Sequence, residues 1–357
     1  MKVPYEPTTE EAALTSKRKD HHLDLCLEED VEGRGGNGFQ HLRFTHNALP
    51  ELSLEAVDTS ARLFGVPLRA PLVIGAMTGG SERAGRVNAI LADAAAQCGI
   101  ALALGSQRAA LQKPELLSTY LGGAKPPLRI GNVGAVQLNY GVTLDDLYRL
   151  ARDAKLDALA LHLNPLQEAI QPEGDTNFSA LRDRIEKVVR GLDLPIILKE
   201  VGSGISEELA SWASSIGVAA IETAGVGGTS WAAVEGFRGQ SRERRLGEVF
   251  RSFGLSTASS LRACRRGAPE VPTIASGGMR SGLDGAKSIA MGARAFAMAR
   301  PFLTAASGHA THSEAVESVV GAIECVIDEL RIAMFCTGSA DLAALEQQSL
   351  TPALSHF

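Results

Sequence analysis

Short apolar runs of strand length recur between residues 70 and 300, and longer stretches with helical periodicity separate them. The runs are Pro71–Met77, Ile100–Leu104, Leu128–Val133, Ala158–Leu163, Pro195–Val201, Ala219–Ala224, Thr273–Ser276 and Ala295–Ala299. The clearest helical stretches are Arg83–Gln97, Leu144–Lys155, Leu181–Arg190, Glu207–Ile216, Leu283–Met291 and Ala315–Ile332. Strands that alternate with helices predict a parallel sheet, and eight such units favour a closed (β/α)8 barrel, the TIM barrel, over an open doubly wound sheet.

We expect a single domain over residues 1–357, in which some segments depart from this repeat. Residues 1–69 are an N-terminal extension that we expect to cover one end of the barrel; the barrel itself spans 70–336, and 337–357 form a tail. Residues 231–254 expand the sixth βα loop, where a lid and a plain surface excursion are both open. Between Ser106 and Leu128, Pro114 and a double proline predict a short or broken helix.

The most informative segment is His162-Leu-Asn-Pro-Leu-Gln-Glu168, at the end of an apolar run. In a strand, His162 and Asn164 lie on the same face, and the proline that follows ends the strand. Gln167 and Glu168 come next in the loop. Because the chemistry of TIM barrels lies at the C-terminal ends of the strands, this group of polar residues predicts a site.

Glycine-rich strand ends predict a phosphate site. Ser276-Gly277-Gly278 ends the seventh strand and Ala299-Arg300 ends the eighth, where this fold commonly binds phosphate against backbone N–H groups. Lys199 ends the fifth strand and needs a partner. It suits the edge of a flavin ring, but a Schiff-base lysine and a structural ion pair with a neighbouring acid remain open.

Three further residues or clusters have more than one interpretation. The basic cluster Lys17–His22 is suited to a diphosphate, although such clusters are usually solvated surface. Glu168 is suited to Mg2+ or to acid–base chemistry. His162 is either an acid–base residue or a histidine whose ring is satisfied in the core.

Composition excludes some classes of function. The formal net charge of -6 gives no electrostatic attraction to nucleic acid. No run reaches the roughly 18 apolar residues of a membrane span, and the first residues are polar. The five cysteines are scattered without a C-x-x-C pair, which is typical of thiols in a reducing cytosol. We therefore expect a cytoplasmic protein that binds neither nucleic acid nor membrane.

The chain resembles the type 2 isopentenyl diphosphate isomerases, which are FMN-dependent (β/α)8 barrels, from about residue 16 to residue 334. The matching motifs are Arg18-Lys-Asp-His-His22, Ala76-Met-Thr-Gly-Gly80, Gly105-Ser-Gln-Arg108, His162-Leu-Asn-Pro-Leu-Gln-Glu168 with Gln171-Pro-Glu-Gly-Asp-Thr-Asn177, Lys199-Glu-Val-Gly202, Gly227-Gly-Thr-Ser-Trp231 and Ser276-Gly-Gly278. The sequence departs from the family pattern at His21, where an acid is common, and at Phe253, where tryptophan is frequent.

The resemblance implies a role for each matching position. The substrate diphosphate and the reacting chain would be held by Arg18, Lys19, His22, Arg108, His162, Asn164 and Gln167. FMN would be held by Ala76, Met77, Thr78, Ser106, Asn132, Lys199 and Thr229, and its phosphate by Gly277, Gly278, Ala299 and Arg300. Glu168 would bind Mg2+. The resemblance also implies NADPH as reductant and a homo-oligomer, a tetramer or octamer.

The implied reaction interconverts isopentenyl and dimethylallyl diphosphate and is redox neutral, yet it needs reduced FMN. Side-chain acids match neither a weakly basic alkene nor a weakly acidic allylic C–H, so our hypothesis is that the reduced flavin, near N5, exchanges the proton. The alternatives are an FMN oxidoreductase of the 2-hydroxy-acid oxidase type, a Schiff-base aldolase and a non-catalytic binding protein. The first requires a late histidine, which Cys264-Arg-Arg-Gly267 lacks.

Overall fold

The computed structural model describes residues 9–353, with side chains described from Lys17 onward. The first eight residues of the predicted extension and the last four of the predicted tail lie outside this range. No helix within residues 9–353 is both long enough and apolar enough to cross a membrane.

Eight parallel strands close into a barrel in the order β10-β11-β4-β5-β6-β7-β8-β9. They are β4 (Leu72–Ile74), β5 (Ala101–Ala103), β6 (Arg129–Gly134), β7 (Ala158–His162), β8 (Ile196–Lys199), β9 (Ala220–Glu222), β10 (Thr273–Ser276) and β11 (Ala295–Met298). Each strand falls on one of the eight apolar runs, with β6 alone ending one residue beyond its run, so the predicted barrel is confirmed. The register sets His162 beside Lys199, and Lys199 beside Glu222, at the C-terminal ends of β7, β8 and β9.

The strands are buried on both faces. Leu72 and Ile74 of β4 pack with the surrounding helices, whereas Val73 packs inside the barrel. The interior contains many small side chains, namely Ala101, Ala103, Ala158, Ala160, Ala220, Ala295 and Ala297. Alternating faces explain why each strand reads as a continuous apolar run.

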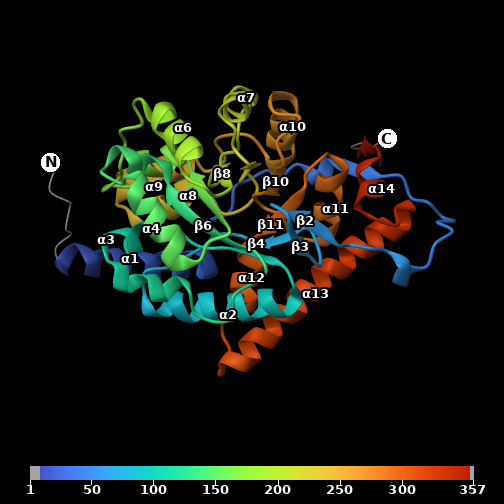
Figure 1. The fold of residues 1–357 in the computed structure, drawn as a ribbon, viewed down its shortest axis with the longest axis horizontal. Coiled ribbons are helices and arrows are strands. Elements are labelled where there is room, and N and C mark those ends of the chain that lie inside the picture. Colours follow the sequence, from blue (N-terminus) through green and yellow to red (C-terminus); the bar gives the residue numbers. More distant parts are fainter. Residues whose placement is uncertain (1–8, 354–357) are drawn as a thin grey trace.

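The six predicted helices are confirmed. They are α2 (Glu82–Cys98), α4 (Leu144–Ala154), α6 (Leu181–Gly191), α7 (Glu207–Ile216), α11 (Gly282–Ala290) and α13 (His312–Thr337). Side-chain caps fix several of their starts: Thr143 and Asp146 form a capping box at α4. The long helix α13 lies beside α2 along one side of the barrel (Figure 1).

Shorter helices complete the connections. After β5, α3 (Arg108–Gln112) gives way at Pro114 to the 3-10 helix η3 (Pro114–Tyr120), which confirms the predicted broken helix. The other short elements are the 3-10 helix η4 (Ala135–Asn139) and helices α5 (Pro165–Ile170), α10 (Thr257–Gly267), α12 (Arg300–Ala305) and α14 (Leu342–Glu346). Helix α5 begins immediately after Asn164, which holds the polar residues of the HLNPLQE segment close to the end of β7.

The N-terminal extension covers the predicted end of the barrel and also the other end, which the sequence did not predict. Helix α1 (Thr9–Glu28) brings Arg18, Lys19 and His22 to the pocket at the C-terminal ends of the strands. The hairpin of β2 (Ala61–Leu63) and β3 (Val66–Leu68) packs Leu63 and Leu68 onto the interior residues at the other end. Between α1 and the hairpin in sequence, β1 (Leu42–Phe44) pairs with β12 (Leu350–Pro352). The 3-10 helices η1 (Phe39–His41) and η2 (Leu54–Ala56) precede and follow β1 in the chain.

The expanded sixth connection folds into two packed helices, α8 (Trp231–Arg238) and α9 (Ser241–Val249). Trp231 lines the pocket and the Glu235 side chain is fully buried, so α8 is not a plain surface excursion. Phe253, one of the two departures from the family pattern, follows α9 and is 60% exposed. Neither Phe253 nor His21 lines the pocket.

Candidate active site

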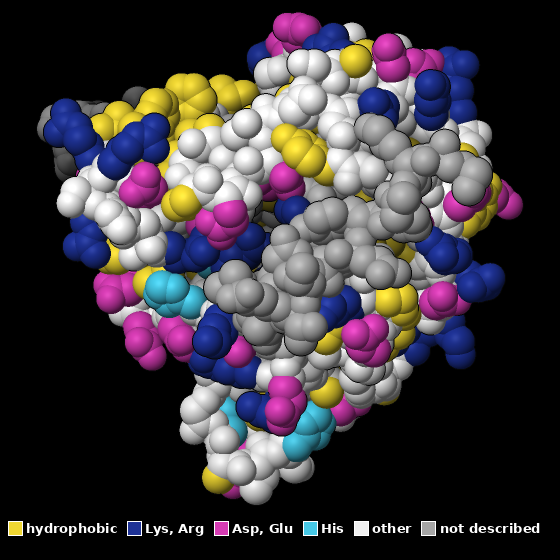
Figure 2. Space-filling view, turned by 90° about the vertical axis from the view of Figure 1, so that its left-hand side faces the viewer, with side chains coloured by type: hydrophobic (Ala, Val, Ile, Leu, Met, Phe, Trp, Pro, Cys, Tyr) yellow, Lys and Arg dark blue, Asp and Glu magenta, His cyan; other side chains and the backbone are white. Residues whose placement is uncertain are grey.

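A cavity of about 230 Å3 lies at the mouth of the barrel, under α1 and α8. On the face of the molecule that carries α1, Lys and Arg side chains border a hollow, with Asp and Glu side chains among them (Figure 2). Every residue predicted for the site lines this cavity: Arg18, Lys19, His22, Ala76, Met77, Thr78, Ser106, Arg108, Asn132, His162, Asn164, Gln167, Glu168, Lys199, Thr229, Gly277, Gly278, Ala299 and Arg300. Parallel strand ends and one N-terminal helix therefore bring residues from eight βα units into one place.

Glycines form a bare backbone surface on one side of the cavity. Gly277 and Gly278 adopt φ of 103° and 70°, a region that residues with a Cβ rarely occupy. A Cβ on Gly277 would lie 2.1 Å from Gly225 O, and one on Gly278 would lie 2.2 Å from Gly227 O. The two glycine loops after β9 and β10 therefore pack backbone against backbone, and Gly225, Gly228, Gly277 and Gly278 line the cavity without side chains.

The cavity wall after β4 has an unpartnered hydroxyl. Thr78 is 4% exposed, and its Oγ1 finds no hydrogen-bond partner among the described residues. A buried hydroxyl without a partner is costly and indicates a polar ligand. The glycine surface and this hydroxyl fit a flat ring with a phosphate tail, which is the shape of FMN.

Lys199 and Glu222, at the ends of β8 and β9, form a buried ion pair. Lys199 Nζ is 3.6 Å from Glu222 Oε1 and donates to Glu200 O at 2.8 Å. Glu222 Oε1 in turn accepts from Ser276 Oγ at 2.8 Å. The sequence left open an ion pair of Lys199 with a neighbouring acid, and that acid is Glu222. Lys199 also lines the cavity, where its side chain can contact a bound ring.

His162 is held as a neutral imidazole. Its Nδ1 lies 2.8 Å from Asn132 Oδ1, which requires a proton on Nδ1 and leaves Nε2 as an acceptor. Burial, with the charges of Lys199 and Lys19, lowers the pKa of His162 to about 3. In the free protein, His162 is therefore suited to orienting a neighbour or accepting a hydrogen bond rather than to donating a proton as an acid.

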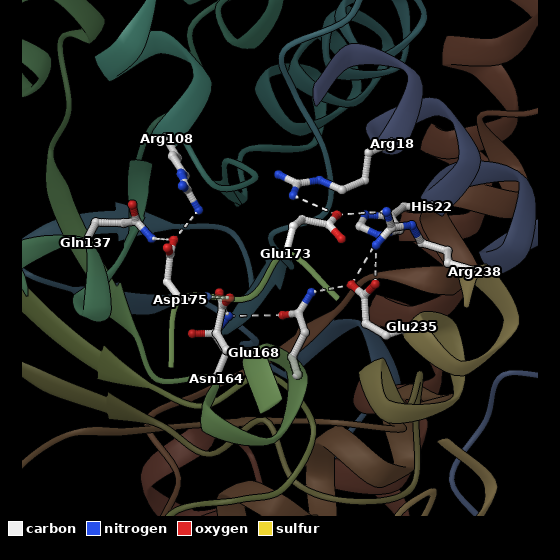
Figure 3. A network of polar contacts seen from close by, with 11 residues as sticks. Arg18, His22, Arg108, Gln137, Asn164, Glu168, Glu173, Asp175, Glu235 and Arg238 are labelled. Atoms are coloured by element: carbon white, nitrogen blue, oxygen red, sulfur yellow. Dashed lines mark hydrogen bonds and ion pairs between the residues drawn. The ribbon is translucent and has the colours of Figure 1, made fainter. Parts of the chain in front are cut away.

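Glu168 sits in a buried hydrogen-bond network. Asn164 Nδ2 donates to Glu168 Oε1 at 2.7 Å, and the Asp175 N–H donates to Glu168 Oε2 at 2.7 Å (Figure 3). Burial raises the pKa of Glu168. Asn164 Oδ1 is buried, and no described residue donates to it. An amide oxygen without a donor beside a carboxylate fits a hard cation such as Mg2+.

Protein side chains alone do not complete such a metal site. Within residues 9–353 no group of three or more His, Cys, Asp or Glu side chains is placed to hold a metal ion. A cation at Glu168 and Asn164 would need oxygen atoms from a ligand or water, which is the usual arrangement for Mg2+ bound with a phosphate.

Two series of hydrogen bonds lead from the Glu168 network to arginine side chains, one through Asp175 to Arg108 and one through Glu235 to Arg238. Arg108 Nη1 donates to Asp175 Oδ2 at 2.5 Å, and Gln137 Nε2 donates to the same oxygen at 2.9 Å. On the other side, Gln167 Nε2 donates to Glu235 Oε1 at 2.9 Å. Figure 3 shows how these contacts join α3, α5 and α8 across the mouth.

Glu235 on α8 contacts three other residues of the site, namely His22, Arg238 and Gln167. Its carboxylate lies 3.3 Å from His22 Nε2 and pairs with Arg238. Burial alone would raise its pKa, but the contacts with His22, the charge of Arg238 and the hydrogen bond from Gln167 hold that pKa below its usual range. Burial lowers the pKa of His22 to about 4, so His22 is neutral near pH 7 and Glu235 is ionised.

Sequence reasoning missed five members of this site: Gln137, Glu173, Asp175, Glu235 and Arg238. Glu173 and Asp175 belong to the QPEGDTN continuation, whose acids were given no role. Glu235 and Arg238 lie in the insert, where an acid and a base three residues apart on one helix face indicated a pair.

The comparisons with known proteins agree with the fold and the cofactor. Residues 135–352 match the family model of FMN-dependent dehydrogenases. A mandelate oxidase variant with an FMN adduct superposes with a TM-score of 0.64 at 18% identity, covering 96% of this chain and 100% of that one. A mandelate oxidase with (S)-2-phenylpropionate gives a TM-score of 0.64 at 19% identity, covering 96% and 99%. The chain is an FMN-dependent (β/α)8-barrel protein.

Curated relatives narrow this class. The isopentenyl-diphosphate delta-isomerase of Nostoc sp. is 46% identical over 344 residues, covering 95% of this chain and 97% of the relative. Those of Synechococcus sp. and Stutzerimonas stutzeri are 47% and 46% identical, covering 96% and 93% of this chain and 97% and 96% of the relatives. The chain belongs to the isopentenyl-diphosphate delta-isomerase family.

Proposed function

We propose that this protein interconverts isopentenyl diphosphate and dimethylallyl diphosphate by a redox-neutral 1,3-allylic proton shift, with reduced FMN as cofactor, in isoprenoid biosynthesis. The observation that carries the proposal is the meeting in one cavity of all the residues to which the resemblance assigns a role, in a chain 46% identical to a protein of that name. Mg2+ and NADPH as the reductant belong to the proposal, as do a homo-oligomer, tetramer or octamer, and a cytoplasmic location.

The diphosphate would bind at the α1 side of the cavity. Arg18, Lys19 and Arg108 supply positive charge there, and the Nε of Arg18 is a buried donor that no described residue satisfies. Charge-assisted hydrogen bonds from arginine to phosphate oxygens are strong and directional. Glu168 and the free Asn164 Oδ1 would hold Mg2+ against the same phosphates.

The hydrocarbon part of the substrate would then reach between the ring site and α8. Gln167 lies beside Glu235 and would orient this part, while Trp231 and α1, which line the cavity, would exclude water from it. Reduced FMN, when bound, supplies a proton-exchanging group matched to the weakly basic alkene. Lys199 would place a cation next to the ring and stabilise its reduced form.

The 2-hydroxy-acid oxidase alternative finds no support at the end of the barrel where such enzymes need a histidine and an arginine. The arginines of Cys264-Arg-Arg-Gly267 point elsewhere: Arg265 donates to Pro269 O at 2.6 Å and Arg266 to Glu207 Oε2 at 2.7 Å. The likeness to mandelate oxidases therefore supports the fold alone.

Omission of single components tests the proposed function. The full chain with FMN, Mg2+ and NADPH should convert isopentenyl diphosphate under anaerobic conditions, and leaving out FMN or the reductant should abolish conversion. Leaving out Mg2+ should lower it by weakening diphosphate binding. Conversion without flavin would contradict the proposal, as would oxidation of 2-hydroxy acids with no isomerisation.

The affinity for substrate is expected to fall as the pH rises through about 8. Burial and the charge of Arg18 lower the pKa of Lys19 to about 8, so the ammonium is charged below this pH and neutral above it. A diphosphate that needs this charge should bind about tenfold more weakly one unit above that pKa. The measurement is KM against pH. Lys19→Arg keeps the charge, so its KM should stay flat to higher pH; an identical rise in both proteins would contradict the role of Lys19.

A further inference from the structure

The loop after α5, residues 171–177, places an acid on each arginine assigned to the diphosphate. Glu173 Oε1 accepts from Arg18 Nη1 at 3.3 Å and from Arg238 Nη2 at 2.9 Å. Asp175 accepts from Arg108 Nη1 at 2.5 Å. The sticks in Figure 3 show both acids turned toward the cations of the mouth. In the free protein, carboxylates therefore already occupy the groups that a diphosphate requires.

The two acids differ in how firmly they are held. Asp175 is tied at its backbone N–H to Glu168 and at its carboxylate to Gln137, and its side chain is 13% exposed. Glu173 has a side chain that is 46% exposed and is held by arginines. Between them, a Cβ on Gly174 would lie 1.9 Å from Glu168 O, so the backbone here is packed tightly. The Glu173 side chain, which is more exposed, is therefore the freer of the two to move without moving the loop.

The two arginines that hold Glu173 are not equally satisfied. Arg238 also pairs with the buried carboxylate of Glu235, so its charge stays compensated if Glu173 shifts. Arg18 pairs with Glu173 through one nitrogen, and its Nε finds no partner among the described residues. Arg18 therefore has unused donors for an anion stronger than a carboxylate.

Glu173 carries its negative charge at neutral pH. Burial opposes ionisation, but the hydrogen bond and charge of Arg238, with the charge of Arg18, hold the pKa of Glu173 below its usual range. An arriving diphosphate thus meets a like charge at the arginine it must bind, and like charges a few ångströms apart repel strongly outside bulk water.

We propose that Glu173 is an internal competitor for the diphosphate: its carboxylate pairs with Arg18 in the empty site and moves fully onto Arg238 when a diphosphate binds. Glu173 thereby sets diphosphate affinity below the value that the cations alone would give, which favours release of a product as highly charged as the substrate. This inference rests on the proposed function, because it assumes that the mouth binds a diphosphate.

The test is the binding of inorganic diphosphate, with equimolar Mg2+, to the FMN-loaded full chain by calorimetry. Glu173→Gln should bind about tenfold more tightly than the unmodified chain, because the amide carries no charge. The matched control is Glu208→Gln on α7, an exposed acid 3.1 Å from Arg182 and outside the cavity, which should bind as the unmodified chain does. Unchanged or weaker binding by Glu173→Gln would overturn the inference and make Glu173 a structural link between α1 and α8.

A second background shows whether the gain passes through Arg18. In the Arg18→Ala background, the further change Glu173→Gln should raise the affinity for diphosphate less than threefold, because the cation for which Glu173 competes is gone. A full tenfold gain in affinity in this background would overturn the proposal that Glu173 competes for Arg18, because it would show that the charge of Glu173 acts on the diphosphate without Arg18. If the unmodified FMN-loaded chain binds no diphosphate at all, the proposed function fails together with this inference, whereas binding without a gain overturns the inference alone.

Discussion

Replacing Glu168 by glutamine is expected to lower the rate of isomerisation by about 100-fold or more and to abolish its dependence on Mg2+. Both carboxylate oxygens accept hydrogen bonds at 2.7 Å, from Asn164 Nδ2 and from the Asp175 N–H. An amide turns one of these oxygens into a donor that faces another donor, and it removes the charge that would hold the cation. Turnover against Mg2+ concentration measures both effects.

The control for Glu168 is the same chemical change at a surface acid. Glu186→Gln breaks an i,i+4 pair with Arg190 on α6, outside the cavity, and should change neither turnover nor Mg2+ dependence. FMN binding by Glu168→Gln should also be retained, because the glycine loops lie after other strands. Full activity with the original Mg2+ dependence would show that Glu168 does not bind the metal.

Replacing Gly277 by alanine is expected to weaken FMN binding by about 100-fold or more. The residue adopts φ of 103°, and a Cβ would lie 2.1 Å from Gly225 O and 2.5 Å from Gly225 N. Backbone atoms cannot rotate away as side chains do, so the two glycine loops must separate and the phosphate surface is lost. Titration of the flavin-free chain with FMN measures the change in affinity.

Gly308→Ala separates the clash from the backbone strain. Gly308 has φ of 83° but no atom within 4 Å of the added Cβ, so alanine there costs only about 1–2 kcal/mol of conformational strain and should leave FMN affinity unchanged. Thermal unfolding of both flavin-free variants shows whether Gly277→Ala retains its fold. Binding of FMN to Gly277→Ala with the original affinity would contradict the assigned phosphate surface.

The barrel and the predicted part of the site follow from local signals. Each buried parallel strand is a continuous apolar run, and most runs are followed closely by Gly, Asn, Ser or Thr, because the strand ends form the mouth. His162, Lys199 and Gly277 could therefore be placed at one end of the barrel before their contacts were known. The basic residues of α1 were placed by resemblance alone, since their motif lies far from the barrel in sequence.

The remaining site residues depend on tertiary pairing that no local pattern encodes. Glu235 is an ordinary helical acid in the sequence, and it becomes central only because α8 packs against α5 and brings it to Gln167. Glu173 meets Arg18 across 155 positions of the chain. The hairpin that closes the far end of the barrel was also missed, because two strands of three residues give little periodicity.

The charge balance of the mouth explains how a chain of net charge -6 is suited to an anion. Arg18, Arg108 and Arg238 converge there, and each is paired with an acid of the 171–177 loop or of α8. Such pairing keeps the cations oriented in the empty site, and it makes diphosphate binding an exchange of partners rather than the filling of a bare positive pocket.

Isomerisation at this mouth with reduced FMN can be tested by the stoichiometry of one anaerobic reaction. The full chain with FMN, Mg2+ and a limiting amount of NADPH is incubated with excess isopentenyl diphosphate, and dimethylallyl diphosphate and oxidised nicotinamide are both counted. We expect many product molecules for each NADPH consumed, because the reductant only prepares the flavin. One NADPH oxidised for each product formed, or reduced flavin with no dimethylallyl diphosphate, would contradict it.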